Sequence, residues 1–146
     1  MSGRTLLAGA KVIDISPNTS QFLLGYPHVN RMIAGVHDPI YASALALECG
    51  GKAIAQCATD ICCITRETTA IVREKVGRAT GLAPEAIVIT ATHTHSAPNV
   101  REPVFDYSDK TVPIPDPQYL AVFNDGISRA IIEAWNARVP AQIAFG

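Results

Sequence analysis

The chain has 146 residues, of which 48% are hydrophobic and 17% charged, and its formal net charge is −1. This length favours a single domain with a core of its own. The balanced charge and the low aromatic content leave no case for a nucleic-acid surface, and no apolar run is long enough to span a bilayer. Because the N-terminus lacks an export signal, we expect a cytoplasmic protein without a transmembrane segment.

The first half of the chain predicts three strands. Residues 6–15 alternate like a strand that ends at Ser16-Pro17, and the apolar runs 40–48 and 52–58 are joined by Gly-Gly, which favours a hairpin. Between them, residues 16–38 show no periodicity, although turns are expected at Gly25-Tyr26 and around His37. A loop of this length in a compact domain is often functional, which makes His37 a candidate site residue.

The second of these apolar runs ends at Thr59-Asp60. Asp60 can cap the following turn, or its carboxylate can orient a histidine, and the sequence leaves both roles open. The four cysteines (Cys49, Cys57, Cys62 and Cys63) lie in apolar surroundings without the spacing of paired C-x-x-C metal ligands. They are therefore expected to be buried, reduced thiols.

The second half predicts two helices. Thr65 can cap a helix over 65–80 that ends at Gly81, and Asp116-Pro117 is a strong start for a helix that reaches about Arg138. A buried strand from residue 86 follows the first helix, so a parallel crossover is expected. The tail 141–146 alternates like a strand that is cut off. The expected fold is α/β, with a mixed sheet and both helices packed against it.

The most informative stretch is 86–99, where an apolar β-branched run turns polar and carries His93 and His95. In an extended chain these two side chains point to one face, while Thr92, Thr94 and Ser96 point to the other. Two imidazoles at the end of a strand are well placed to share a metal ion or a substrate oxygen. The alternative is that both rings are satisfied by threonine hydroxyls and backbone groups.

A metal site needs more protein ligands than this pair. The other candidates, none at a diagnostic spacing, are His37, Asp60, Glu102 and Asp106. Ser96 does not lie in a G-x-S-x-G motif, and on the opposite face it is expected to be structural rather than a nucleophile. The proline-rich segment 100–115 follows the histidines directly, so it is either a wall of a pocket over them or a surface excursion.

The residues from Thr90 to Pro98, T-A-T-H-T-H-S-A-P, resemble the T-H-T-H-S-G/A-P signature of the neutral/alkaline, non-lysosomal ceramidase family. The resemblance covers nearly the whole chain. Residues 8–17 are similar to the family's A-G-x-x-x-x-D-I-T-P strand, with Ser16 in place of threonine, and Leu24-Gly25-Tyr26 resembles its G-Y turn. Residues 35–45 are similar to G-I-H-D-P-L-Y-A-R-A-L of shorter bacterial members, with Ser43 in place of arginine.

This resemblance implies a zinc-dependent amidase that hydrolyses the N-acyl amide bond of a small or lipid-like substrate. It assigns His93 to the zinc and His95 to the substrate or the oxyanion. It leaves His37, Asp60 and Ser96 as candidates for contacting the substrate or orienting the site. A W-F-x-x-H-P histidine, a G-D-x-S-P-N serine, a glutamate and a tyrosine that complete such a site do not occur in this chain.

Residues 1–146 are therefore expected to form one domain that is the N-terminal portion of a larger ceramidase-like catalytic domain. Because a single assured ligand cannot hold zinc tightly, this chain alone is expected to be inactive. Two alternatives stay open. The chain can be a non-catalytic α/β module that binds a small ligand or a partner subunit, or part of a metal hydrolase of other specificity.

Overall fold

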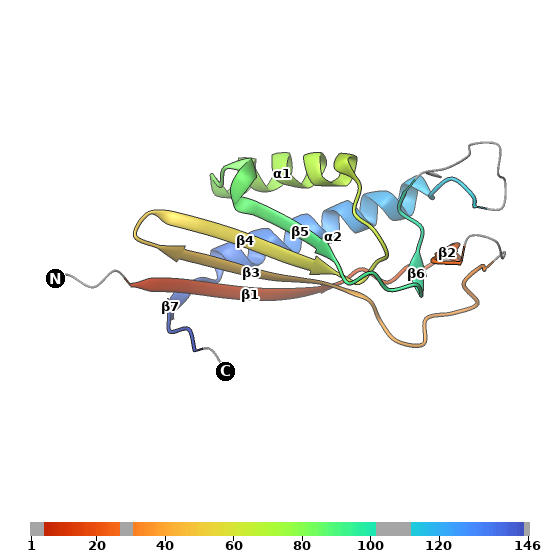
Figure 1. Ribbon diagram of the computed structural model, residues 1–146, viewed down its shortest axis with the longest axis horizontal. Coiled ribbons are helices and arrows are strands. Elements are labelled where there is room, and N and C mark those ends of the chain that lie inside the picture. Colours follow the sequence, from red (N-terminus) through yellow and green to blue (C-terminus); the bar gives the residue numbers. More distant parts are fainter. Residues whose placement is uncertain (1–4, 27–30, 102–111, 145–146) are drawn as a thin grey trace.

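A computed structural model describes residues 5–26, 31–101 and 112–144 of the chain. Its main sheet has the strand order β5-β4-β3-β1-β7, with two helices beside it (Figure 1). The strands of this sheet are β1 (Leu6–Asp14), β3 (Tyr41–Cys49), β4 (Lys52–Thr59), β5 (Ile87–Ala91) and β7 (Val139–Ala141). The helices are α1 (Arg66–Thr80) and α2 (Pro117–Asn136), and a short 3₁₀ turn, Pro84–Ala86, precedes β5. The predicted α/β fold with a mixed sheet is confirmed.

The part β5-β4-β3 of this order follows from two connections that the sequence predicts. Gly50 and Gly51 both have positive φ (58° and 77°), as a tight hairpin turn requires, and they join β3 to β4 in antiparallel register. Helix α1 then carries the chain across to β5, which pairs parallel with β4 from Ala55↔Ile87 to Thr59↔Ala91. The ends of β4 and β5 therefore lie side by side, and the polar residues that follow the two strands meet there.

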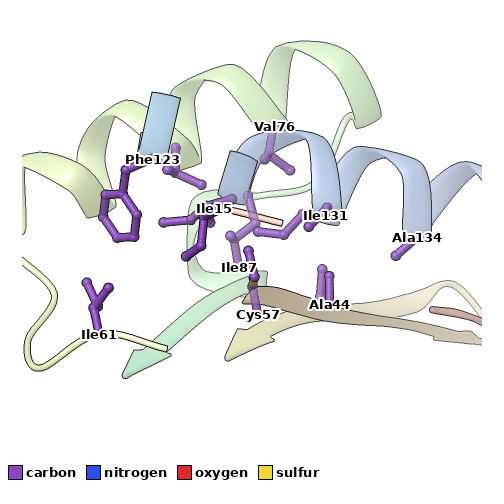
Figure 2. Close-up of a cluster of buried hydrophobic side chains, with 14 of the residues drawn as sticks. Ile15, Ala44, Cys57, Ile61, Val76, Ile87, Phe123, Ile131 and Ala134 are labelled. Atoms are coloured by element: carbon purple, nitrogen blue, oxygen red, sulfur yellow. The ribbon is translucent and has the colours of Figure 1, made fainter. Parts of the chain in front are cut away.

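One face of the sheet is covered by both helices. Figure 2 shows side chains from α1 and α2 pointing toward the strands, with Val76 and Ile131 above Cys57 and Ala44. The sheet side of this core consists largely of small residues: Ala42, Ala44, Ala46, Ala55 and Cys57, all at most 5% exposed. Small side chains let α2 lie close to the strands, because the backbones can approach until larger helix side chains fill the space.

The other face of the sheet carries no helix in the described part of the chain, as Figure 1 shows. Its alternating side chains include Val12, Leu45 and Ile54, which are between 45% and 55% exposed. The alternation that buries Ala44 and Cys57 therefore leaves apolar neighbours in contact with solvent.

Both helices begin where their capping residues predict. The Thr65 hydroxyl accepts a hydrogen bond from the Thr68 N–H (3.0 Å), and Asp116 Oδ1 accepts one from the Gln118 N–H (2.9 Å). Helix α2 ends at Asn136, two residues before the expected Arg138. None of the helices in the described ranges is long and apolar enough to cross a membrane.

Asp116 also joins the start of α2 to the loop after β1, because its Oδ2 accepts a hydrogen bond from Gln21 Nε2 (2.9 Å). This bond and the Gln118 N–H hold the pKa of Asp116 below its ordinary value. A carboxylate of this kind stabilises the fold above its unfolded pKa of about 4, and the contribution is lost as the pH falls through the lower folded pKa.

Asp116→Ala is therefore expected to lower the free energy of unfolding by about 1 kcal/mol at pH 7, through loss of the cap. The difference from wild type should narrow below about pH 4. Urea unfolding at both pH values measures this, with Asp38→Ala as a matched control, because Asp38 is an exposed aspartate outside any helix. An equal effect of the two substitutions at pH 7 would contradict the capping role.

Two segments differ from what the sequence predicts. The tail forms its strand at Val139–Ala141 rather than over 141–146, and β7 pairs with Leu6–Ala8 of β1. Pro140 is tolerated there because β7 is an edge strand. The aperiodic segment 16–38 contains β2 (Leu23–Leu24), which pairs with β6 (Ala97–Pro98). Two-residue strands are too short to leave a periodic signal in a sequence.

Candidate metal and substrate site

The chain leaves β5 through a left-handed residue. β5 ends at Ala91, and His93 has φ 63°, the only positive φ at a non-glycine residue in the described part of the chain. The sequence predicted that His93 and His95 share a face because the strand stays extended. That prediction of an extended backbone is wrong, yet the rings do meet, with their centroids 5.0 Å apart and their planes at 71°. Strained non-glycine backbone of this kind is concentrated at functional sites.

Hydrogen bonds that continue the β4–β5 pairing hold His93 in this conformation. The Thr92 N–H donates to the Thr59 carbonyl (2.9 Å) and the His93 N–H donates to the Ile61 carbonyl (3.0 Å). The next carbonyl along, that of Cys62, lies 2.7 Å from His93 Nδ1. With the ring proton on Nδ1, this bond fixes the imidazole and leaves the lone pair on Nε2, which is how metal-binding histidines are commonly oriented.

His95 is held from the other side by the loop that contains β2. Arg31 Nη1 donates to the His95 carbonyl (3.2 Å), and the Arg31 guanidinium lies 4.7 Å from the centre of the Tyr26 ring. The Tyr26 ring meets the His95 ring edge-on at 5.5 Å. Gly25 fits beneath, where an added Cβ would lie 2.4 Å from His95 Cβ. The predicted Gly25-Tyr26 turn, together with Arg31, thus forms the packing site of His95.

A thiol joins the two histidines. Cys62 Sγ lies 3.7 Å from His93 Nδ1, and one donor atom each from Cys62, His93 and His95 lie within 4.8 Å of one another. In the part of the chain that the structure describes, this is the one cluster of three potential metal ligands. Thiolate and imidazole are ligands that zinc accepts, so the residues present fit the metal that the resemblance implies.

None of the four cysteines forms a disulfide; Cys57 and Cys62 are buried as the sequence predicts, whereas Cys49 and Cys63 are only half-buried. Cys62 is more than a core residue. The residue is 7% exposed, and its thiol lies 3.7 Å from the Cys63 thiol. Burial, and then the neighbouring Cys63, raise the pKa of Cys62 to about 11, while the Arg101 guanidinium opposes this. Cys62 is therefore protonated at neutral pH until a cation displaces its proton.

The remaining site residues that the sequence suggested lie around a cavity apart from the histidine cluster. A cavity of about 500 Å³ is lined by His37, Asp60, Thr94 and Ser96 among others, and neither His93 nor His95 lines it. The segment after β5 thus presents its histidines to one side and Thr94 and Ser96 to the other. His37 Nδ1 pairs with Asp38 Oδ2 (2.8 Å) at a side chain that is 95% exposed.

Asp60 accepts a hydrogen bond at Oδ2 from the Tyr41 N–H (3.0 Å), at the start of β3. This contact holds the end of the β3–β4 hairpin, next to the strand end that carries the histidines. Of the other ligand candidates, Glu102 and Asp106 lie outside the described residues, as does most of the expected pocket wall 100–115.

Sequence reasoning missed Cys62, Tyr26 and Arg31 as neighbours of the histidines. Cys62 becomes recognisable only with the parallel register. This register pairs Thr59 with Ala91, and continuing it by three residues places position 62 beside position 94. Tyr26 and Arg31 gave no signal, because their position depends on the short β2–β6 pairing.

No protein-family model matches the sequence, and no curated protein does. Solved structures do match. The neutral ceramidase from Pseudomonas aeruginosa superposes with a TM-score of 0.81 at 23% identity, over 95% of this chain and 23% of that one. A ceramidase complexed with C2 matches with a TM-score of 0.69 at 22% identity, over 94% of this chain and 22% of that one. This chain therefore spans less than a quarter of the length of either match, and the resemblance predicted from the T-H-T-H-S-A-P motif is confirmed in the fold: the chain folds as a portion of neutral ceramidase does.

Proposed function

We propose that this chain forms part of a zinc-dependent amidohydrolase that cleaves an N-acyl amide bond in a small, lipid-like substrate. The observation that carries the proposal is the pair of histidines after β5, with His93 held in a left-handed conformation and its Nδ1 on the Cys62 carbonyl. The fold shared with ceramidases adds support. A cytoplasmic location remains a sequence-based prediction.

His93 is proposed to bind the metal through Nε2, because its Nδ1–H is engaged by the Cys62 carbonyl at 2.7 Å. A bound zinc ion would supply Lewis-acid polarisation of the amide carbonyl. Its ligands beyond this chain are proposed to come from the further length that the matched ceramidases have.

His95 is proposed to face the substrate and to donate a hydrogen bond to the oxygen that becomes negatively charged. Its ring lies 5.0 Å from that of His93, so both imidazoles can reach one carbonyl group. The packing site formed by Gly25, Tyr26 and Arg31 fixes the His95 backbone. Such a donor stabilises the transition state only if its position is set before the reaction.

The cavity apart from the histidine cluster is proposed to contribute to substrate binding through His37, Asp60 and Ser96. These residues line the cavity on the other side of the segment that carries the histidines, where a group of the substrate remote from the amide can lie. Ser96 lines this cavity and not the histidine cluster, which favours a binding or structural role over that of a nucleophile.

His93→Ala is the direct test of the metal. The test uses the parent protein, meaning the longer amidohydrolase of which this chain is proposed to form part. There the substitution is expected to reduce bound zinc to background and to abolish amide hydrolysis, because the remaining ligands cannot hold the ion. Elemental analysis of the purified variant measures the first effect. His37→Ala is the matched control, since His37 is an exposed imidazole bonded to Asp38 and stands apart from the ligand cluster. It should retain zinc.

Unchanged zinc in His93→Ala would count against the assignment of this ligand, and a parent protein without zinc would favour the non-catalytic module. A screen of N-acyl amides and esters separates a ceramidase-like specificity from another metal hydrolase. The 146-residue chain alone is expected not to hydrolyse amides, because the serine, glutamate and tyrosine motifs of the family do not occur in it.

A further inference from the structure

The thiol of Cys62 touches the histidine that is proposed to bind the metal, and the proposed function does not use it. Its Sγ is 3.7 Å from His93 Nδ1, at the mouth of the cluster where His93 is exposed and His95 half-buried. Cys57 is the contrasting case. Its thiol is fully buried in the core and contacts the carbonyl of Ala58.

We propose that the Cys62 thiolate binds the metal ion that His93 holds. The inference rests on the proposed function for the presence of the ion, and it adds a sulfur ligand that the family motif does not contain. Binding forms a metal–sulfur bond, and the thiol proton leaves to solvent, so no oxidant or reductant is needed. Sulfur and imidazole together suit zinc and other borderline or soft divalent ions.

The geometry is close to that of a bound cluster. Ligand atoms on one tetrahedral zinc lie about 3.3 to 3.6 Å apart, whereas the three donor atoms here lie within 4.8 Å of one another. The sulfur lies beside His93 Nδ1, so side-chain rotation must both close this difference and bring the sulfur toward Nε2, the nitrogen that is proposed to bind the metal. The Cys62 thiol has weak contacts with Cys63 and His93 to give up, and a cysteine side chain moves between staggered rotamers without moving the backbone.

The backbone already fixes two members of the cluster relative to each other. The bonds from Thr92 to Thr59 and from His93 to Ile61 tie the segment after β5 to the segment after β4. Cys62 is therefore held beside His93 by the same ladder that sets the left-handed turn. With His95 as a third donor in reach, the 146-residue chain carries enough ligands to hold a divalent ion by itself, even though His95 is proposed to face substrate in the parent protein.

Cobalt(II) is the probe that tests this inference, because a Co²⁺–thiolate bond gives a charge-transfer band in the near ultraviolet that imidazole ligands do not give. The purified chain is titrated with Co²⁺ under reducing conditions, as wild type and as Cys62→Ser, Cys62→Ala, Cys63→Ser and His93→Ala. Cys63 is the matched control, an adjacent thiol 3.7 Å from the Cys62 sulfur and bonded to Arg101.

Wild type and Cys63→Ser are expected to show the band, and both Cys62 variants to lose it and to bind Co²⁺ at least about tenfold more weakly. His93→Ala should lose both the band and the binding. Circular dichroism confirms that each variant is folded, and agreement between the serine and alanine variants separates loss of the ligand from a local packing defect.

Co²⁺ binding that depends on His93 but shows no thiolate band would overturn the inference and leave the proposed metal at His93 in place. A band that survives in Cys62→Ala, or no Co²⁺ binding by the wild-type chain, would overturn it as well. Conversely, the band can be present while the zinc-loaded parent protein fails to hydrolyse any amide. That result would reject the proposed function and keep Cys62 as a ligand.

Discussion

Gly9→Ala is expected to lower the free energy of unfolding more than the other glycine-to-alanine substitutions described below. Gly9 lies in β1 under the end of α2, where an added Cβ would be 2.1 Å from the Ala134 carbonyl oxygen and 2.9 Å from the Arg138 nitrogen. Both are backbone atoms, so relief requires the helix to move off the sheet. Overpacking of this kind costs about 3 kcal/mol or more, and urea unfolding followed by circular dichroism measures it.

Gly35→Ala is the matched control, because a Cβ at Gly35 has no atom within 4 Å and the residue does not have positive φ. It is expected to change the unfolding free energy by less than about 0.5 kcal/mol. If Gly9→Ala were equally mild, α2 would not lie as close to β1 as the small residues beneath it indicate.

Gly25→Ala is expected to have the largest effect on the site itself. The Cβ would lie 2.4 Å from His95 Cβ and 2.5 Å from His95 Cγ, and the residue has φ 136°. The methyl group must displace His95, and displacements of about 1 Å at such sites cost on the order of a hundredfold in catalysis. We expect at least a tenfold loss of Co²⁺ affinity in the chain, measured by titration, and a larger loss of the proposed amide hydrolysis in the longer protein.

Gly51→Ala separates this effect from simple backbone strain. Gly51 also has positive φ (77°), but a Cβ there meets no atom within 4 Å. It lies in the β3–β4 turn at the opposite end of these strands from the histidines. It should therefore destabilise the fold by about 1 kcal/mol and leave the Co²⁺ affinity unchanged. Equal affinities for the Gly25 and Gly51 variants would show that Gly25 does not position His95.

The sequence predicts the parts of this fold that rest on local signals. Thr65 and Asp116 mark helix starts through their own side-chain hydrogen bonds, and Gly50-Gly51 marks a turn that other residues adopt poorly. What it does not predict depends on distant partners. The strand at Val139–Ala141 begins two residues earlier than its alternation indicates, because β1 offers a free edge there.

The same distinction applies within the site. The motif around His93 and His95 is recognisable, but the left-handed φ of His93 is imposed by the carbonyls of Thr59 and Ile61, thirty or so positions earlier in the chain. An argument from the alternation of side chains cannot include such a constraint. It therefore predicts correctly that the two histidine rings lie together, but from an extended backbone that the chain does not adopt. The approach of Cys62 has the same origin, and only the parallel register between β4 and β5 reveals it.

The pairing of β7 with β1 has a consequence for how the chain is made. β1 is synthesised about 130 residues before its partner at Val139–Ala141. At ordinary elongation rates the interval is on the order of ten seconds. During that time one edge of β1 presents unpaired N–H and C=O groups while its other edge can already pair with β3. Along β1 the nascent chain is thus open to chaperones and to misassociation with neighbouring chains on a polysome.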